Sequence, residues 1–536
     1  MANGIAYKQA QLADAWDAIV IGSGIGGLTA AVLLGQYGDK RVLVLERHYE
    51  AGGFTHTFHR PGYEWDVGLH YVGQLRSERS NVRRAFDHLT GGQVRWEPME
   101  EVYDRFLIAG QKFEFAAGLE RFREGLKRSF PSEGTAIDKY VAAVQACNRA
   151  SGLYYAEKAL PGPLARLAGG MMRAGYMRWA RRTTRDVLQS LTGNRELIGV
   201  LTAQWGDYGL PPGMSSFAVH ATIAEHYFEG ASYPVGGAGT IAAAMGRRIE
   251  AYGGAVVTSA EVTGIVLEAG KAAGVRMADG REFRSELVVS DAGAANTFER
   301  LLPAELPAMD GLRARLKTLA PSTAHCSLYL GLEGNDAELG LKGTNLWIYP
   351  SFDHDANVER LASDIDAPLA GIYLSFPSAK DPSFKERYPG KSTMEVLTMV
   401  PYAAFARWAQ TRWKHRGEDY DALKRRLAAR LREEAERQVP SIAGHVACEE
   451  LSTPVTTRHF ANYGHGEIYG ISATPERYLM RELGARTPVK GLYLAGQDGS
   501  CLGVVGALFG GAISASAALG RNLISQLSKP WSGSEA

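Results

Sequence analysis

Apolar and polar positions alternate along this chain in blocks, and the first blocks are the most informative. Residues 18–21 and 41–46 are short, largely apolar runs, which are typical of strands buried on both faces of a parallel sheet. Residues 28–37, between them, are rich in helix-forming side chains. This order predicts a strand–helix–strand unit of about thirty residues near the N-terminus.

The same patterns recur further along the chain. Residues 260–267 and 272–277 predict a hairpin, and residues 287–295 predict a strand that returns to the first sheet. A last apolar run opens the segment 491–511, which continues into a glycine-spaced helix start. Further strands are predicted at 323–332, 371–377 and 392–401, and further helices at 132–150 and 419–438.

Three glycines follow the first predicted strand. Gly22, Gly24 and Gly27 match the G-x-G-x-x-G pattern in its strand–helix setting. There the first glycine makes a tight turn, the second lets the backbone approach a pyrophosphate, and the third lets the helix pack closely. Glu46 ends the second strand, where a carboxylate accepts both ribose hydroxyls. The pattern favours FAD or NAD over NADP, and a glycine turn without a ligand is the plain alternative.

Two further glycine motifs favour FAD. Glu46 and Arg47 are followed by Gly52-Gly53-Phe54-Thr55, and in two-dinucleotide-type flavoproteins such a second loop approaches the long pyrophosphate and ribityl chain. Near the C-terminus, Asp498 is a candidate to bind a cofactor hydroxyl, and the amides near Val505 are candidates to face a flavin. We therefore predict FAD and no metal. The candidate cofactor-binding residues are Gly22, Gly24, Gly27, Glu46, Arg47, Gly52, Gly53, Phe54, Thr55, Val262, Asp498, Val505 and Gly506.

Two segments carry a resemblance to a known family. YEWDVGLHYVGQL at 63–75, and GLYLAGQD with GVVGALFGG at 491–511, resemble the phytoene desaturase, carotenoid isomerase and retinol saturase superfamily of FAD enzymes. They look closest to the retinol saturase branch, because carotenoid isomerases usually carry Gly-Asp where this chain has Gly496-Gln497-Asp498. With the predicted elements, the resemblance implies an α/β fold with a discontinuous two-dinucleotide-binding-type FAD domain and an α+β substrate domain.

The FAD domain is predicted to be assembled from three separate segments, with the substrate domain between them. Val262, at the start of the central hairpin, is the candidate for contact with the adenine. The predicted FAD-binding parts are 15–75, 232–300 and 485–525, the substrate-domain parts are 76–231 and 301–484, and residues 526–536 are predicted to be a loose tail.

Composition narrows the class of protein. The chain has 536 residues, 45% of them hydrophobic, and a formal net charge of +1, so it is long enough for two domains and gives no reason to expect a nucleic-acid partner. Its four cysteines show no zinc-ligand spacing, and no secretion-signal pattern opens the chain, so we expect a cytoplasmic protein. Residues 499–520 lack charge but contain many glycines and serines, which predicts a buried helix rather than a membrane span.

One segment suits a membrane surface. Between Glu157 and Asp186 there is no acidic residue, and residues 158–185 combine arginines with leucine, methionine and aromatic side chains. Such a segment fits the face of an anionic bilayer. Two interpretations stay open: a peripheral contact on the inner face of a membrane, and a solvated helix whose apolar side packs on the body of the protein.

The resemblance implies flavin chemistry on an apolar polyene or isoprenoid lipid. Reduction of a C=C bond is favoured, as in retinol saturases. Desaturation at an allylic C–H bond and cis–trans isomerisation of a carotenoid-like substrate are the alternatives, and a non-catalytic lipid- or prenyl-binding module is a remote one. No second G-x-G-x-x-G appears, so we expect a separate electron carrier, a quinone or oxygen as the electron partner.

The candidate residues for proton transfer are His70, Tyr71 and Glu467. His70 and Tyr71 lie in a segment that matches the saturase pattern, and histidine is well tuned for proton transfer near neutral pH. Glu467 lies in the polar, glycine-rich segment 459–470, which suits a pocket-lining loop. The alternatives are a buried histidine satisfied by backbone and an ordinary glycine-rich connection.

Overall fold

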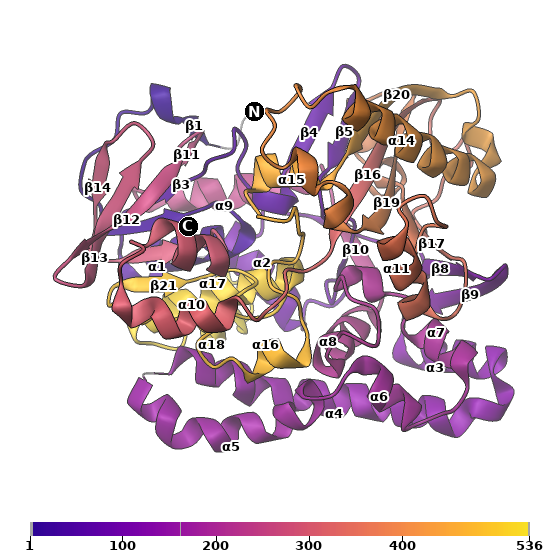
Figure 1. The fold of residues 1–536 in the computed structure, drawn as a ribbon, viewed down its shortest axis with the longest axis horizontal. Coiled ribbons are helices and arrows are strands. Elements are labelled where there is room, and N and C mark those ends of the chain that lie inside the picture. Colours follow the sequence, from indigo (N-terminus) through magenta and orange to yellow (C-terminus); the bar gives the residue numbers. More distant parts are fainter. Residues whose placement is uncertain (1–3, 161, 534–536) are drawn as a thin grey trace.

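The first sheet has six strands and gathers them from three distant parts of the chain (Figure 1). The computed structural model describes residues 4–160 and 162–533. The strand order is β1, β11, β3, β2, β15, β21, and every neighbouring pair is parallel. This confirms the predicted discontinuous α/β fold. The strands are β1 (Ile5–Ala6), β2 (Ala18–Ile21), β3 (Val42–Leu45), β11 (Ala255–Thr258), β15 (Val288–Ser290) and β21 (Leu492–Leu494).

Alternate residues of β2 enter two different cores, which explains the continuous apolar run. Ala18 and Val20 pack with helices α1 (Ile25–Gly38) and α17 (Gly503–Leu519) on one face of the sheet. Ile19 and Ile21 pack with the antiparallel hairpin β12 (Val262–Glu268) and β13 (Lys271–Met277) on the other. Strands buried on both faces read as unbroken apolar sequence.

Helix α17 is the buried helix predicted within 499–520, and it crosses α1 closely. A Cβ added at Gly511 of α17 would lie 2.1 Å from the backbone oxygen of Gly26 in α1. Only glycine allows this approach, so the crossing depends on it. In the described ranges, no helix is long and apolar enough to cross a membrane.

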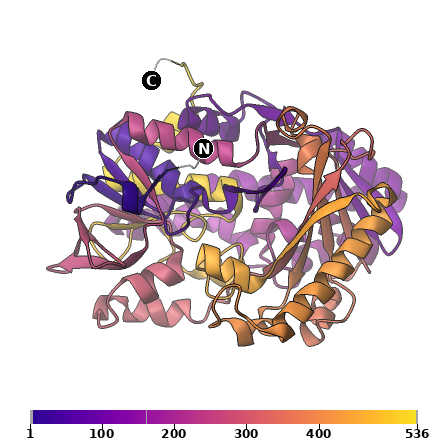
Figure 2. The same ribbon diagram turned by 90° about the horizontal axis from the view of Figure 1, so that it is seen from above.

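The second sheet has seven strands, in the order β20, β16, β19, β18, β17, β8, β9, and forms the neighbouring lobe (Figure 2). One face packs on helix α14 and the other on a layer that includes α4, α5 and α8. The bounds are β8 (Val102–Ile108), β9 (Gln111–Ala116), β16 (Ala324–Glu333), β17 (Asn345–Tyr349), β18 (Ile372–Ser375), β19 (Lys391–Val400), β20 (Val446–Ser452), α4 (Gly134–Ala159), α5 (Gly162–Ala180), α8 (Phe217–Tyr227) and α14 (Glu418–Gln438).

Shorter elements surround the two sheets. The predicted strands at 323–332, 371–377 and 392–401 are present as β16, β18 and β19, whereas β8 and β9 were not predicted. The remaining strands are β4 (Thr57–Arg60), β5 (Tyr63–Asp66), β6 (Val72–Gly73), β7 (Trp96–Pro98), β10 (Ala231–Pro234) and β14 (Glu282–Arg284). The remaining α-helices are α2 (Asn81–Thr90), α3 (Leu119–Ser129), α6 (Thr184–Gln189), α7 (Arg195–Leu201), α9 (Gly239–Ala251), α10 (Asp310–Leu316), α11 (His354–Ser363), α12 (Pro377–Lys380), α13 (Phe384–Arg387), α15 (Pro454–Ala461), α16 (Pro475–Leu479) and α18 (Ile524–Leu527).

At two predicted domain boundaries, the neighbouring elements pack on the other lobe than the one predicted. Helix α2 and strand β7 pack into the core of the first lobe, although the substrate domain was predicted to begin at residue 76. Helix α10 packs beneath the β12–β13 hairpin, beyond the boundary predicted at residue 300. An amphipathic pattern predicts that a helix covers a sheet but does not specify which sheet.

The prediction of a loose tail is wrong for residues 526–533. The side chain of Arg84 donates to the Ser528 backbone oxygen at 2.7 Å, and His88 Nε2 lies 3.0 Å from the Lys529 backbone oxygen. The Trp531 ring lies 5.2 Å from the His88 ring and 5.2 Å from the guanidinium carbon of Arg248. The tail therefore packs on helices α2 and α9. Residues 534–536 of the predicted tail lie outside the described part.

We expect Trp531→Ala to lower the free energy of unfolding by about 1–2 kcal/mol, because the variant loses a cation–π contact and ring packing. Thermal unfolding would measure the change as a lower Tm. Lys529→Ala is the control, because its ammonium group bonds the Gln526 side chain at the surface. Equal melting temperatures for both variants and the parent protein would contradict the packed tail.

Candidate active site

The two lobes share one continuous cavity of about 2270 Å³. Its walls include the glycine loops of the first lobe and aromatic side chains of the second. Pockets for single drug-sized ligands usually measure roughly 300–1,000 Å³. The cavity therefore has room for a dinucleotide and for a second elongated molecule.

The first glycine loop joins β2 to α1 at one end of this cavity. Gly22 has a φ of +93°, which favours glycine. A Cβ at Gly27 would lie 2.3 Å from the Gly22 backbone oxygen, and a Cβ at Gly24 would lie 2.4 Å from the Asp291 carboxylate. Gly22 and Gly24 line the cavity, and Gly27 packs α1 onto β2 behind them, so the residues fit the start of a dinucleotide site.

Glu46 ends β3 beside the loop and lines the cavity. Its Oε2 accepts hydrogen bonds from the Ser23 amide at 2.9 Å and the Ser23 hydroxyl at 2.7 Å. Its Oε1 accepts from the His48 amide at 2.7 Å. These bonds hold the carboxylate over the loop, and carboxylate oxygens have further lone pairs that can accept ribose hydroxyls.

Arg47 and Val262 both line the cavity, and the bond from the Ala260 amide to the Glu46 backbone oxygen (2.7 Å) joins their segments in one corner. The Arg47 guanidinium donates to the backbone oxygens of His459 and Phe460, the second at 3.2 Å. Arg47 therefore fixes the end of α15 against this corner. Val262 opens β12, and its contact with the adenine stays a prediction.

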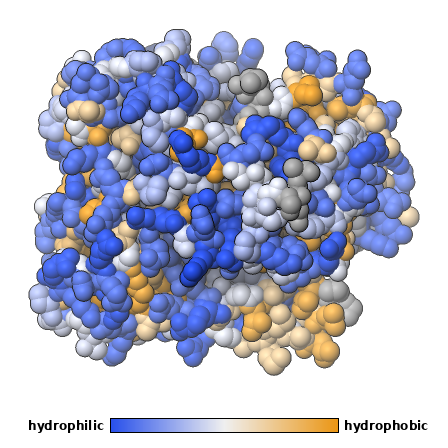
Figure 3. All heavy atoms as spheres, turned by 180° about the vertical axis from the view of Figure 1, so that it is seen from behind, coloured by the Kyte–Doolittle hydropathy of each residue, from blue (hydrophilic) through white to orange (hydrophobic). Residues whose placement is uncertain are grey.

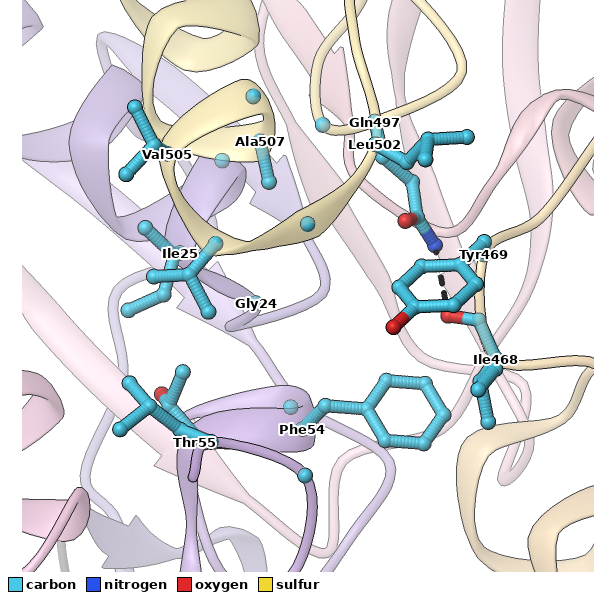
Figure 4. A pocket seen from close by; sticks show the side chains of 18 of the residues that line it. Gly24, Ile25, Phe54, Thr55, Ile468, Tyr469, Gln497, Leu502, Val505 and Ala507 are labelled. Atoms are coloured by element: carbon cyan, nitrogen blue, oxygen red, sulfur yellow. Dashed lines mark hydrogen bonds between the residues drawn. The ribbon is translucent and has the colours of Figure 1, made fainter. Parts of the chain in front are cut away.

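The second glycine loop faces the start of α17. Figure 4 shows Phe54 and Thr55 on one side of the pocket and Val505 on the other. The Thr55 hydroxyl donates to the Gly52 backbone oxygen at 2.8 Å. A Cβ at Gly53 would lie 3.0 Å from Gly24 Cα, so the two glycine loops form one continuous cradle.

The loop after β21 closes the pocket from the C-terminal side. Gln497 donates from Nε2 to the Ile468 backbone oxygen at 3.2 Å (dashed line in Figure 4). The Asp498 carboxylate accepts from the Ala294 amide at 2.8 Å and the Ile471 amide at 2.9 Å. Asp498 thus joins two backbone segments and also lines the cavity, and its bond to a cofactor hydroxyl stays a prediction. Val505 and Gly506 also line the cavity, and their place beside a flavin stays a prediction.

Asp291 was not singled out from the sequence. It follows β15, lines the cavity and bonds the Gly27 amide at the start of α1. Burial raises the pKa of its carboxyl to about 7, helped by the charges of Glu46 and Asp498 and opposed by the Gly27 amide. The sequence does carry one feature that could have indicated Asp291: a carboxyl side chain directly after an apolar strand.

His70 stands between the cavity and the second sheet. Its Nδ1 lies 2.7 Å from Oε2 of Glu395 on β19, and Lys380 donates from Nζ to the His70 backbone oxygen at 3.0 Å. Burial raises the pKa of Glu395 to about 8, and burial together with the Lys380 charge lowers the pKa of His70 to about 3. At neutral pH the carboxyl group therefore keeps its proton and the imidazole is uncharged.

Tyr71 lies beside two further buried acids, Asp104 and Asp207. Its hydroxyl is 2.8 Å from Asp207 Oδ2 and 3.1 Å from Asp104 Oδ2. Gln204 donates to Asp104 at 2.7 Å. Burial raises the pKa of both carboxyl groups, and Asp207 and Tyr71 line the cavity. The sequence indicated Tyr71 but not its two partners, which come from distant segments.

Glu467 does not reach the cavity among the described residues. Its neighbours Tyr463, Ile468 and Tyr469 line the wall, whereas its own Oε2 accepts from the His465 amide at 2.7 Å. Burial raises the pKa of Glu467. The carboxyl group therefore stabilises the loop, and its predicted role in proton transfer has no support from its position.

Comparison with known proteins shows which proteins this chain is similar to. Residues 20–89 match the NAD(P)-binding Rossmann-like domain. The chain is 39% identical to an all-trans-retinol 13,14-reductase of Danio rerio over 95% of this chain and 86% of that protein. The Homo sapiens protein of that name is 35% identical over 97% and 88% of the two chains.

More distant relatives have other names. A Danio rerio protein named inactive all-trans-retinol 13,14-reductase is 34% identical over 96% of this chain and 88% of its own. A chloroplastic prolycopene isomerase of an Oncidium hybrid is 27% identical over 94% and 84%. Wild-type putrescine oxidase bound to putrescine matches in fold, with a TM-score of 0.62, 16% identity, and coverage of 95% of this chain and 99% of that one.

The parallel sheet, the glycine cradle and the cavity shared with a second sheet define a dinucleotide-binding oxidoreductase of the flavoprotein-like fold class. The similar proteins identify the family within that class. The chain belongs to the all-trans-retinol 13,14-reductase family, so the resemblance found in the sequence is confirmed.

We expect Gly27→Ala to abolish retention of a bound dinucleotide, because the new Cβ would push α1 away from β2. Absorbance of the purified protein, and of the supernatant after heat release, would measure the bound cofactor. Gly170→Ala in α5 is the matched control, because no atom lies within 4 Å of its added Cβ. Cofactor content in Gly27→Ala equal to that of the parent protein would contradict the site.

Proposed function

We propose that this protein is an FAD-dependent enzyme that reduces one C=C bond of a polyene alcohol of the retinol type. One observation carries the proposal: a single cavity joins the glycine cradle to an aromatic chamber, in a chain 39% identical to an all-trans-retinol 13,14-reductase. A bound flavin supplies hydride chemistry, and the protein supplies orientation, exclusion of water and the proton.

The cradle suits FAD better than a nicotinamide dinucleotide. Its two loops are contiguous, since Gly24 and Gly53 nearly touch, and this length matches a cofactor with a ribityl chain. Glu46 is placed to hold the ribose and Val262 the adenine. The second glycine loop and Val505 would flank the isoalloxazine ring.

The chamber on the second sheet suits a conjugated chain. Tyr71 and Tyr227 stack with ring centroids 4.5 Å apart, and Trp347 and Tyr373 lie 4.4 Å apart. All four rings line the cavity. Flat aromatic walls bind an extended apolar molecule and keep water from the reacting bond.

Two other activities use the same flavin. The prolycopene isomerase relatives favour cis–trans isomerisation as the second candidate, at lower identity. Desaturation is the same hydride transfer in reverse. A non-catalytic lipid- or prenyl-binding module is not favoured, because the complete glycine motif is retained at Gly22, Gly24 and Gly27. The relative named inactive is the reason that activity has to be measured and not inferred from identity.

A single-turnover experiment distinguishes these activities. We expect anaerobic, reduced, FAD-loaded protein to be reoxidised by all-trans-retinol in detergent, and the lipid to gain two hydrogens, as seen by flavin absorbance and mass spectrometry. An unchanged lipid mass with a shifted retention time would indicate isomerisation. A flavin that stays reduced with every polyene tested would rule out reduction. Repeated reduction needs a separate electron carrier that returns two electrons to the flavin, whereas in the desaturation alternative a quinone or oxygen would accept them.

We also propose that the segment 158–185 contacts a membrane surface, mainly through an exposed apolar patch. Leu167 and Met171 of α5 are 86% and 81% exposed, and Figure 3 shows an apolar patch at its lower right. Tyr155 and Ala159 of the neighbouring α4 line the cavity, so this patch stands beside a route for an apolar substrate. The patch consists of Leu153, Leu164, Leu167 and Met171, with Arg178, Arg181 and Arg182 exposed nearby.

Two basic residues of the segment do not face outward. Arg173 is buried and donates to the Tyr478 backbone oxygen at 2.9 Å. Lys158 donates to the Leu483 backbone oxygen, and burial lowers its pKa to about 7. Pro161 and the side chain of Arg166 lie outside the described part. The proposed peripheral contact therefore relies on the apolar patch more than on charge.

We expect the double variant Leu167→Glu and Met171→Glu to reduce flotation with anionic liposomes by tenfold or more, since each buried apolar side chain contributes about 1.5–3 kcal/mol. Ile5→Glu, at an exposed apolar position on β1, is the matched control. Equal flotation of the double variant and the parent protein would exclude this surface.

A further inference from the structure

The histidine between the cavity and Glu395 has two differently placed edges. Its Nδ1 is shielded from solvent and lies 2.7 Å from Oε2 of Glu395, a close contact in which the two groups are not aligned as a hydrogen bond. The side chain as a whole remains 14% exposed, whereas that of Glu395 is 0% exposed. Because His70 lines the cavity, the exposed edge of the ring is the one that carries Nε2. The imidazole therefore connects a fully buried carboxyl group to the place where a substrate would lie.

We propose that Glu395, acting through His70, supplies the proton that completes reduction of the C=C bond, an inference that rests on the proposed function. A bound, reduced flavin would supply the hydride for one carbon of the double bond. The other carbon receives the Nε2 proton of His70, so one C–H bond forms and one N–H bond breaks. The Glu395 proton moves to Nδ1 in the same step, once the carboxyl group, which lies 2.7 Å away, has turned into line with the Nδ1 lone pair. His70 ends neutral and Glu395 ends as a carboxylate.

The surroundings of Glu395 suit a group that holds and releases a proton. Lys380 is buried close to the pair, and its Nζ also bonds the Ser375 hydroxyl at 2.7 Å. Burial lowers the pKa of Lys380 to about 7, and nearby acidic groups, Glu395 first among them, oppose this effect. A new negative charge on Glu395 would therefore favour protonation of Lys380, which neutralises the site after the step. The titratable or charged groups that face Glu395 are His70, Asp66, Tyr233, Tyr329, Tyr373 and Lys380.

His325 is the competing proton donor. It also lines the cavity, and burial lowers its pKa to about 4. Among the described residues no carboxyl oxygen lies within 4.0 Å of its ring nitrogens, whereas Glu395 lies 2.7 Å from His70 Nδ1, so His325 has no carboxyl group behind it to replace a donated proton. This difference makes His325→Gln the matched control for the pair formed by His70 and Glu395.

The pH dependence of single-turnover reoxidation tests the proposal. The donating form is the protonated one, and burial raises the pKa of Glu395 to about 8. We therefore expect the rate constant to be level below pH 8 and to fall about tenfold per pH unit above it. Glu395→Gln should lower the plateau about 10²–10⁴-fold, the usual contribution of a general acid, and remove the inflection. His325→Gln should keep the inflection.

Infrared spectroscopy provides a readout independent of turnover. We expect the FAD-loaded protein without substrate to show the C=O band of a protonated carboxyl group that disappears as the pH rises through about 8 and is absent in Glu395→Gln. Glu434→Gln, which removes another buried glutamate, should leave the band in place.

Different results would overturn the proton assignment and the proposed function. If the parent protein is reoxidised by retinol but Glu395→Gln keeps both its rate and its inflection, the proton assignment is wrong. Loss of the inflection in His325→Gln alone would also overturn it. If no polyene reoxidises the parent protein, the proposed function fails, and with it the assignment of the proton to this reaction.

Discussion

The meeting of three parallel strand ends is the constraint on which the rest of this structure depends. β2, β15 and β21 come from the two ends and the middle of the chain, and their carboxyl ends lie side by side. A Cβ added at Gly26 would lie 2.5 Å from Gly496 Cα and 2.6 Å from Asp291 Oδ1. Any larger side chain there would separate the loops and deform the cradle. The cofactor site is therefore a product of long-range register as well as of a local motif.

Burial then decides the chemistry of the neighbouring chamber. Ionised carboxyl groups are costly where water is excluded. Glu395, Asp104 and Asp207 accordingly have raised pKa values, and desolvation is the largest cause in each. The raised pKa values favour the protonated forms of these buried acids, and Asp104 and Asp207 are joined through the Tyr71 hydroxyl. This arrangement suits a reaction in which carbon must receive a proton next to an apolar chain.

The features that could be predicted from the sequence are those that depend on residues close together in the chain. Gly22 and Gly27 act within one short turn, so their spacing was sufficient, and the long apolar runs predicted β16 and β19. The partnership of His70 with Glu395 depends on how β19 packs against β5 and the segment after it, which no local pattern encodes. The inward position of Arg173 in the basic segment 158–185 could not be predicted for a related reason: composition indicates a basic helix, but only packing shows which of its arginines turn inward.

A structure of the FAD-loaded, oxidised protein with all-trans-retinol bound would test the central claim most directly, because oxidised flavin cannot reduce the lipid. We predict an isoalloxazine ring between Thr55 and Val505, and a polyene in the aromatic chamber. One double bond should lie within about 3.5 Å of the flavin, with His70 on the other carbon. A polyene bound elsewhere, or one that keeps His70 out of reach, would contradict the account.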